Sequence, residues 1–191
     1  MREKDETSGI RWVPRVEEVA VFRRDIQWNP VRTESKRANT ARLNHYVMFE
    51  IEHRLEGKGI MRRDIVAAAM DLYVSHGIGA DEAAKKLDEK IGKAFEDPNV
   101  SSLLLSAILL EDELYWRRKN SEIADDPVFL LSDEIIGMAI AEVIGGTYAR
   151  FEFTRYDQKK PGILSKLGPF LDDAVAGLIA GCTSRLYSES M

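Results

Sequence analysis

The sequence contains a single cysteine, Cys182, so it cannot form a disulfide within the chain. A lone cysteine and the lack of a secretory leader predict a protein of the reducing cytoplasm. Cys182 lies among small and apolar residues of a predicted helix, where a buried, unreactive side chain is the usual state. We therefore do not expect it to be a nucleophile.

The sequence also lacks an apolar run long enough to cross a bilayer, which takes about 20 mostly apolar residues. The run Val100–Leu110 is too short for this. Residues 127–144 are interrupted by Asp133, Glu134 and Glu142. No membrane span is expected.

An excess of positive charge is missing as well. Lys and Arg number 27 against 32 Asp and Glu, which gives a formal net charge of -5. A general nucleic-acid binder needs a surplus of cations to displace counterions, so this class is disfavoured. With 45% hydrophobic and 31% charged residues over 191 positions, the chain is typical of a globular protein with one core.

No alternation of strands with helices is present, which disfavours a parallel α/β sheet. The pattern predicts an all-α fold, namely a single-domain bundle of about six helices over residues 39–191. Residues 1–38 form a polar predicted N-terminal arm, which carries Trp12, Phe22 and Trp28. These aromatic side chains could pack on the helical body or contact a partner.

Glycines, prolines and capping residues set the limits of the predicted helices. The predicted ranges are about 43–55, 65–74, 81–95, 98–114, 127–145 and 170–186. Asp97 and Pro98 are typical of a helix start. Residues 101–110 are apolar on most sides, which predicts that this helix is central. Residues 147–168 are interpreted as a linker.

Two pairs of adjacent acids, Asp133-Glu134 and Asp172-Asp173, lie within or beside apolar helical patterns. A buried carboxylate is unfavourable unless it meets a cation, a metal or hydrogen-bond donors. Capping of a helix start explains Asp172-Asp173 about as well as a site does. It explains Asp133-Glu134 less well, because these residues are predicted to lie inside their helix.

The segment between these pairs carries Arg155, Asp157, Lys159 and Lys160. Carboxylates bind Mg²⁺, and Arg or Lys side chains hold phosphate oxygens, so the combination suits phosphate chemistry.

Gly137 and Gly177 each follow an acid by four residues, Asp133 and Asp173 respectively, so two helices could approach closely there. A face formed by Gly177, Gly181 and Ser184 leaves open whether it packs within the chain or across a homo-oligomer.

Other candidates carry less weight. His45, His53 and His76 do not form a zinc motif. The acids Glu111, Asp112 and Glu113 are typical of a solvated helix face, although one of them could complete a metal site.

Three blocks then resemble a known family. They are Asp133-Glu134-x-x-Gly137, Phe153-x-Arg155-x-Asp157-x-x-Lys160-Pro161 and Asp172-Asp173-x-x-Ala176-Gly177. Their order and spacing resemble those of phosphatidylglycerophosphatase A. Within that family the chain is most similar to the soluble archaeal branch known as α-ribazole phosphatase, and this similarity extends back through Gly79-Ala80-Asp81, Glu96-Asp97-Pro98-Asn99 and residues 103–110. It lacks the Gly-Thr-x-Gly-Ser-like block of the membrane-embedded lipid branch.

The resemblance implies an α-helical phosphomonoesterase that requires Mg²⁺ and acts on a small phosphate ester. The predicted metal ligands are Asp133, Asp157, Asp172 and Asp173. The metal would orient the phosphate and activate a water. Glu134 is a ligand or the general base, and Asp157 and Asp173 are further catalytic candidates. Arg155 and Lys160 would bind the phosphate oxygens. A phosphoenzyme formed on an aspartate stays open.

A soluble substrate such as α-ribazole 5'-phosphate, in cobamide (cobalamin) nucleotide-loop assembly, is favoured over phosphatidylglycerophosphate. One alternative is a non-catalytic helical protein that binds a metal. Another is a nucleotide pyrophosphohydrolase, which is disfavoured because its paired Glu-x-x-Glu and Glu-x-x-Asp motifs do not appear.

Overall fold

The computed structural model describes residues 51–75, 77–120 and 130–190. The described chain is all-helical, as predicted. The predicted N-terminal arm, residues 39–50 and the start predicted for the fifth helix at Pro127 lie outside the described residues.

Residues 51–57 are helical, and the later elements follow in chain order. They are α3 (Arg62–Asp71), α4 (Ala80–Glu96), α5 (Pro98–Asn120), α6 (Ser132–Gly145), α7 (Ala149–Lys159), the 3₁₀ helix η1 (Gly162–Lys166) and α8 (Pro169–Ser190).

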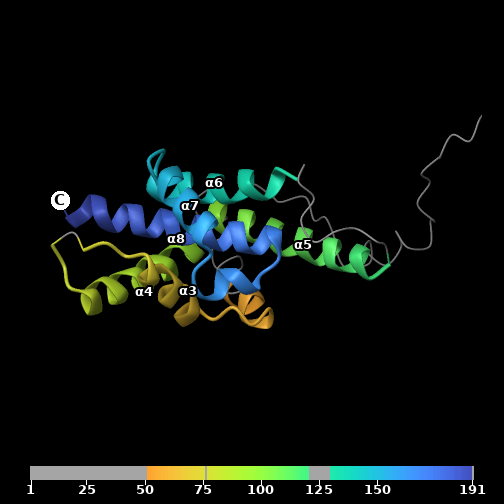
Figure 1. Ribbon diagram of the computed structural model, residues 1–191, viewed down its shortest axis with the longest axis horizontal. Coiled ribbons are helices and arrows are strands. Elements are labelled where there is room, and N and C mark those ends of the chain that lie inside the picture. Colours follow the sequence, from red (N-terminus) through yellow and green to blue (C-terminus); the bar gives the residue numbers. More distant parts are fainter. Residues whose placement is uncertain (1–50, 76, 121–129, 191) are drawn as a thin grey trace, which may run out of the picture. The chain divides into compact units, whose positions relative to one another are not determined.

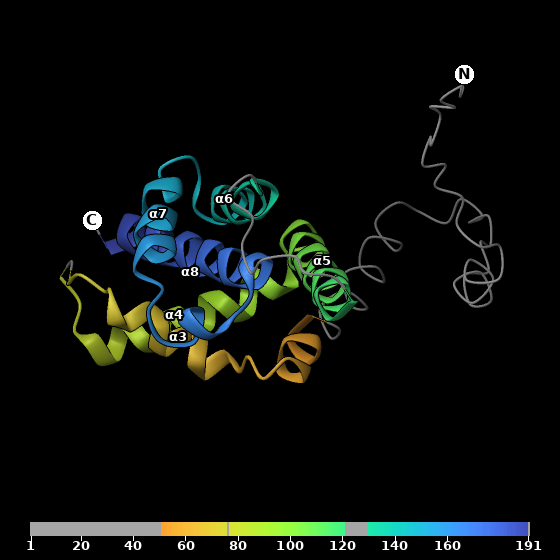
Figure 2. The ribbon, with the colours of Figure 1, turned by 45° about the vertical axis from the view of Figure 1, so that its right-hand side comes forward.

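Helix α8 is the centre of the body. Every residue from Phe170 to Ser184 is buried. Helices α6 and α7 pack on one side of it and α3 and α4 on another, with α5 beside it (Figures 1 and 2). The prediction that residues 101–110 form the central helix was wrong, because the side chains of Leu109 and Leu110 are 53% and 39% exposed.

Small residues explain why α8 can be surrounded. A Cβ atom added to Gly177 would lie 2.1 Å from the carbonyl oxygen of Gly137, and one added to Gly145 would lie 2.7 Å from the carbonyl oxygen of Gly181. Both distances are far below van der Waals contact, so α6 and α8 touch through their backbones. The close approach expected at Gly137 and Gly177 is confirmed.

The linker predicted over residues 147–168 is also wrong. Most of it forms α7 and η1. Ala149, Phe153 and Tyr156 are the buried residues of α7, at helical spacing, and the Tyr156 hydroxyl donates to the carbonyl oxygen of Ala69 at 2.9 Å. The charged residues between them obscured this apolar stripe in the sequence.

Other boundaries agree with the capping signals. Asp97 accepts the backbone N–H of Asn99 at 2.7 Å and so caps α5, as predicted. Helix α3 ends at Asp71 rather than at Val74. The Val74 N–H donates instead to the Tyr187 hydroxyl at 3.0 Å, which fixes the chain in a non-helical course. Among the described helices, none has the length and apolar character to cross a membrane.

Candidate metal and phosphate site

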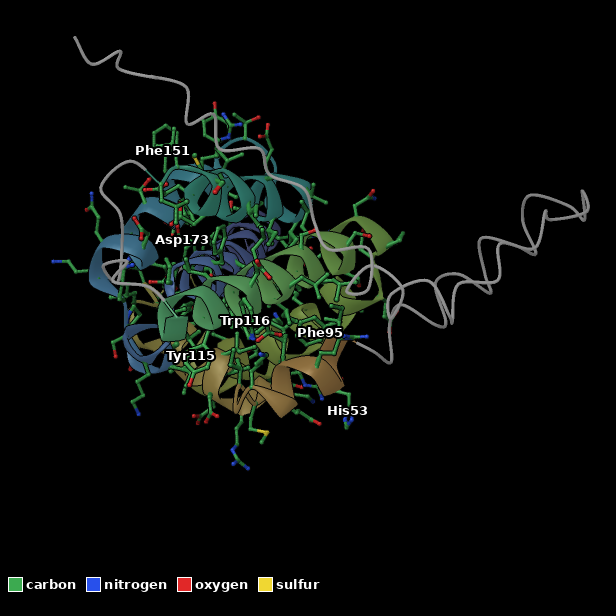
Figure 3. All side chains as sticks on the ribbon, turned by 90° about the vertical axis from the view of Figure 1, so that its right-hand side faces the viewer. His53, Phe95, Tyr115, Trp116, Phe151 and Asp173 are labelled. Atoms are coloured by element: carbon green, nitrogen blue, oxygen red, sulfur yellow. The ribbon has the colours of Figure 1, made fainter. Side chains whose placement is uncertain are left out.

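The acids Asp133, Glu134 and Asp173 come together where the starts of α6 and α8 meet. Helix α6 begins at Ser132, so Asp133 and Glu134 lie in its first turn and not inside the helix as predicted. The backbone contact of Gly137 with Gly177, one turn further along, sets this close approach. Figure 3 shows Asp173 among the helices.

Two of these three acids are buried, which capping alone does not require. Asp133 and Asp173 are only 4% and 3% exposed. One oxygen atom from each of Asp133, Glu134 and Asp173 lies within 4.8 Å of the others. The Oε2 atom of Glu134 is buried with no hydrogen-bond partner among the described residues. Oxygen atoms gathered in this way suit a hard divalent cation such as Mg²⁺, so the residues present fit the predicted metal.

The raised pKa values of Asp173 and Glu134 also indicate a cation site. Burial raises the pKa of Asp173, and the neighbouring carboxylates Asp172 and Asp157 raise it further. Burial, followed by a hydrogen bond with Asp133, also raises the pKa of Glu134. A carboxylate whose charge is disfavoured in this way gains most when a cation enters.

Two more predicted site residues lie beside the cluster. Asp157, on α7, lies close enough to Asp173 to help raise the pKa of that carboxyl group. Asp172 is 6% exposed and binds the Lys160 ammonium group through Oδ2, while its Oδ1 is buried without a partner among the described residues. Lys160 Nζ also lies 3.5 Å from Asp157 Oδ1. Lys160 therefore connects the C-terminal end of α7 to the first turn of α8.

The backbone of Lys160 is unusual. It has φ 42° and ψ 55°, the left-handed conformation that commonly ends a helix at a glycine. Of the residues described, Lys160 alone has positive φ without being glycine. A non-glycine residue in this conformation is strained by about 1–2 kcal/mol. The strained turn directs a cationic side chain to the carboxylates, which a glycine could not supply.

Arg155 is placed differently. Its Nη1 atom donates to Glu152 Oε2 at 2.6 Å, and its Nη2 atom donates to the carbonyl oxygen of Leu72 at 2.9 Å. These contacts tie α7 to the end of α3 and do not bring the guanidinium to the acid cluster. Its predicted phosphate-binding role stays a prediction that this arrangement does not favour.

We expect Arg155→Gln to lower the free energy of unfolding by about 1–2 kcal/mol, because an ion pair and a hydrogen bond to a carbonyl are lost. The KM for a phosphate ester should stay within about twofold of the wild-type value, since the side chain binds no substrate in this arrangement. Thermal melts and steady-state kinetics measure both effects. A KM that rises tenfold would restore Arg155 to the phosphate site.

The metal-free protein should lose stability as pH rises. Burial raises the pKa of Asp172 to about 6, although Lys160 favours its charged form, and that of Asp173 is raised as well. Unfolded Asp titrates near pH 3.9, so these groups favour the folded state fully only below about that pH, and the contribution is lost as pH rises through the folded pKa. We therefore expect the Tm in chelator to fall from about pH 4 upward, less steeply in Asp173→Asn, and Mg²⁺ to restore it. A wild-type Tm that matched the mutant's pH dependence would contradict this.

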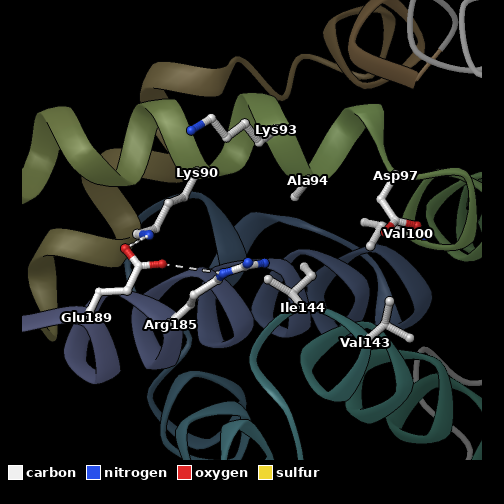
Figure 4. A pocket seen from close by; sticks show the side chains of 9 residues that line it. All are labelled: Lys90, Lys93, Ala94, Asp97, Val100, Val143, Ile144, Arg185 and Glu189. Atoms are coloured by element: carbon white, nitrogen blue, oxygen red, sulfur yellow. Dashed lines mark hydrogen bonds and ion pairs between the residues drawn. The ribbon is translucent and has the colours of Figure 1, made fainter.

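A separate cavity of about 210 Å³ lies towards the other ends of α6 and α8 (Figure 4). Its lining residues are Lys90, Lys93, Ala94, Asp97, Val100, Val143, Ile144, Arg185 and Glu189. Glu189 already pairs with both Lys90 and Arg185. Arg185 follows Asp173 by about 18 Å of helix, at 1.5 Å per residue, so this cavity is not part of the carboxylate site.

The remaining candidates take ordinary roles. The Cys182 thiol is buried, which raises its pKa to about 12, so it is not a nucleophile. The exposed His53 lies 3.9 Å from Glu56. His45 and His76 lie outside the described residues. Asp112 pairs with Lys58. Glu111 is not with the acid cluster; its carboxylate accepts N–H groups at the start of α8.

Known proteins resemble this chain in sequence and fold. The family model of phosphatidylglycerophosphatase A matches residues 87–188, which include every predicted site residue. An uncharacterised protein of Methanocaldococcus jannaschii is 45% identical over 124 residues, which are 63% of this chain and 98% of that protein.

Solved structures share the fold. Protein ypjQ of Bacillus subtilis aligns with a TM-score of 0.64 at 24% identity, over 76% of this chain and 96% of its own. The low temperature requirement C protein of Listeria monocytogenes aligns with a TM-score of 0.60 at 22% identity, over 75% and 96%.

Proposed function

Because the chain belongs to the phosphatidylglycerophosphatase A family, we propose that it is a Mg²⁺-dependent phosphomonoester hydrolase whose site lies where α6, α7 and α8 meet. The observation that carries this proposal is the cluster of Asp133, Glu134 and Asp173, of which the two aspartates are buried. Its oxygen atoms converge without a cationic side chain bound to Asp133 or Glu134 among the described contacts. The charged form of such a cluster is unfavourable unless a cation joins it.

Asp133 and Asp173 would hold the cation, with Glu134 as a further ligand or as the general base. Asp157 and Asp172 flank the cluster and could extend the ligand set, since Asp172 Oδ1 has no other partner among the described residues. A bound Mg²⁺ would polarise the phosphate and lower the pKa of an attacking water. The raised pKa of Glu134 makes its carboxylate a stronger proton acceptor than that of an ordinary glutamate, which suits a general base.

Lys160 would contact the non-bridging phosphate oxygens. Its ammonium group already lies at the edge of the cluster, held by Asp172 and near Asp157. A phosphate that enters beside the metal would meet this cation, whose fixed charge offsets the charge of the transition state.

For the substrate we propose a soluble phosphate ester, namely α-ribazole 5'-phosphate, handled in the cytoplasm. This rests on the branch resemblance of the sequence. It is consistent with the finding that no described helix can span a membrane.

A lipid substrate is the second candidate, and one observation favours it. Near the cluster in sequence, Leu131 just before α6 and Ile135 of α6 are 64% and 54% exposed, and Phe151 of α7 is 70% exposed. Phe151 points outward at the edge of the molecule in Figure 3. Apolar side chains of this kind could rest on a membrane surface that presents phosphatidylglycerophosphate.

The experiment is phosphate release from a panel that holds α-ribazole 5'-phosphate, phosphatidylglycerophosphate in micelles and several nucleotides, each with Mg²⁺ and with chelator. Mg²⁺-dependent release from the ribazole compound alone supports the proposal in full. Release from the lipid alone selects the second candidate. Metal binding without any release would indicate a non-catalytic metal-binding protein.

A further inference from the structure

The start of α8, the helix that carries Asp172 and Asp173, is capped by a side chain from another helix. The two residues before Phe170 are Gly168, which has no side chain, and Pro169, which has no N–H. Glu111 Oε2, on α5, instead accepts the N–H of Phe170 at 3.0 Å and that of Leu171 at 3.4 Å. The cap therefore comes from 59 residues earlier in the chain.

The chain around this contact leaves room only for a glycine. A Cβ atom added to Gly168 would lie 1.8 Å from Glu111 Oε1 and 2.5 Å from its carboxyl carbon, so any side chain there would expel the carboxylate. Gly168 does not have a positive φ. Its lack of a side chain is needed for the approach of Glu111 and not for a special backbone conformation.

The capped turn leads directly into the carboxylate site. The Asp172 N–H donates to the carbonyl oxygen of Gly168 at 2.9 Å, within the turn that Glu111 holds. Because the carboxylate binds two successive N–H groups, it restrains both the position of this turn along the α8 axis and its rotation about that axis. A rotation of the turn would carry Asp172 and Asp173 with it.

We propose that Glu111 is a positioning residue for the cation site, which acts by fixing the first turn of α8 and with it the carboxylates of Asp172 and Asp173. This inference rests on the proposed function. The Glu111 carboxylate also occupies the N–H groups that would otherwise attract an anion, so the substrate phosphate binds elsewhere, at Lys160.

The test compares Glu111→Gln with Glu111→Ala in a titration with Mn²⁺, measured by calorimetry well below each variant's Tm. Both variants remove the charge, but only glutamine keeps an oxygen atom that can accept the two N–H groups. Mutation of a residue that orients metal ligands typically lowers the metal affinity by about 10- to 100-fold. Glu111→Ala should therefore weaken Mn²⁺ binding by about 10-fold or more. Glu111→Gln should bind several-fold more tightly than Glu111→Ala. Asp112→Asn, which removes the neighbouring charge without touching α8, is the matched control and should bind like wild type.

Gly168→Ala provides an independent test, because it expels the carboxylate while leaving Glu111 in the chain. It should weaken Mn²⁺ binding as Glu111→Ala does, and the double variant should be no weaker than either single one, since both remove the same contact. Glu111→Met, which keeps the side-chain length, replaces Glu111→Ala if the alanine variant does not fold.

The outcomes separate this inference from the proposed function. A wild-type protein that does not bind Mn²⁺ overturns both. If the wild-type protein binds Mn²⁺ and Glu111→Ala binds it with the same affinity, the positioning role alone is overturned. A lower Tm in that variant would then show Glu111 to be only a stabilising cap. Equal weakening in Glu111→Gln and Glu111→Ala would also overturn it, because the loss would then follow the charge.

Discussion

Asp173→Asn is expected to lower Mg²⁺-dependent phosphate release by more than about 100-fold. Mutation of a residue that only orients a metal ligand already lowers activity by about 10- to 100-fold, and Asp173 is itself a proposed ligand. Asp173 is 3% exposed and lies in the cluster with Asp133 and Glu134. Asparagine has nearly the same shape but no charge, so the fold should persist while the affinity for the cation falls. The measurement is steady-state phosphate release over a range of Mg²⁺ concentrations.

The same variant should be more stable than wild type when metal is absent. Burial, followed by the neighbouring carboxylates, raises the pKa of Asp173, and the uncharged amide removes the free-energy cost of a charge at this position. Each kcal/mol recovered raises the Tm by about 2–4 °C in a protein of this size. Asp112→Asn, at an exposed ion pair, is the control and should change neither property. An Asp173→Asn protein that kept full turnover would remove Asp173 from the site.

Gly177→Ala is expected to lower the free energy of unfolding by about 3 kcal/mol or more, at the upper end for overpacked cores. The new methyl group would lie 2.1 Å from the carbonyl oxygen of Gly137 and 3.0 Å from its Cα. Both are backbone atoms of α6, so neither can move aside without separating the two helices. The Tm should fall by about 10 °C.

Gly57→Ala is the matched control for this change. It lies at the end of the helical segment 51–57, and an added Cβ would meet nothing within 4 Å. Alanine should leave stability unchanged or raise it by up to about 1 kcal/mol. Equal Tm values for Gly177→Ala and wild type would contradict the backbone contact between α6 and α8.

Local signals in the sequence predicted much of the fold. Asp97 and Pro98 indicated the start of α5, and Gly145-Gly146 indicated the end of α6. Gly137 and Gly177 were placed correctly at a close helix contact. A helix start or end depends on a few neighbouring residues, and a close helix contact depends on small side chains. Neighbouring residues and side-chain size can both be read from the sequence.

The centre of the fold could not be predicted in this way. Residues 101–110 are more apolar than the start of α8, yet α8 is the buried helix. Its alanines and glycines let other helices approach on every side, and hydrophobicity alone does not measure this. Helix α7 was missed because Phe153 and Tyr156 are separated by charged residues, which lowered the apolar signal of the segment.

The candidate site was likewise predicted only in part. The types and order of the residues indicated which acids to consider, but not which side of each helix faces the site. Arg155 and Asp157 are two positions apart on α7, about 200° around the helix, so at most one of them can face α8. The structure turns Asp157 towards Asp173 and Arg155 towards Leu72. The capping role of Glu111 depends on a contact between α5 and α8 that no local pattern contains.

If carboxylates from α6 and α8 hold a divalent cation, a crystal soaked in Mn²⁺ should show that cation between them. Mn²⁺ takes the oxygen ligands that Mg²⁺ takes and gives an anomalous signal that locates it. We expect a peak bounded by Asp133, Glu134 and Asp173, and we expect Asp173→Asn to lose it. A fully soaked wild-type crystal with no peak there, or with its strongest peak at another group of acids, would mean that these carboxylates are not the cation site.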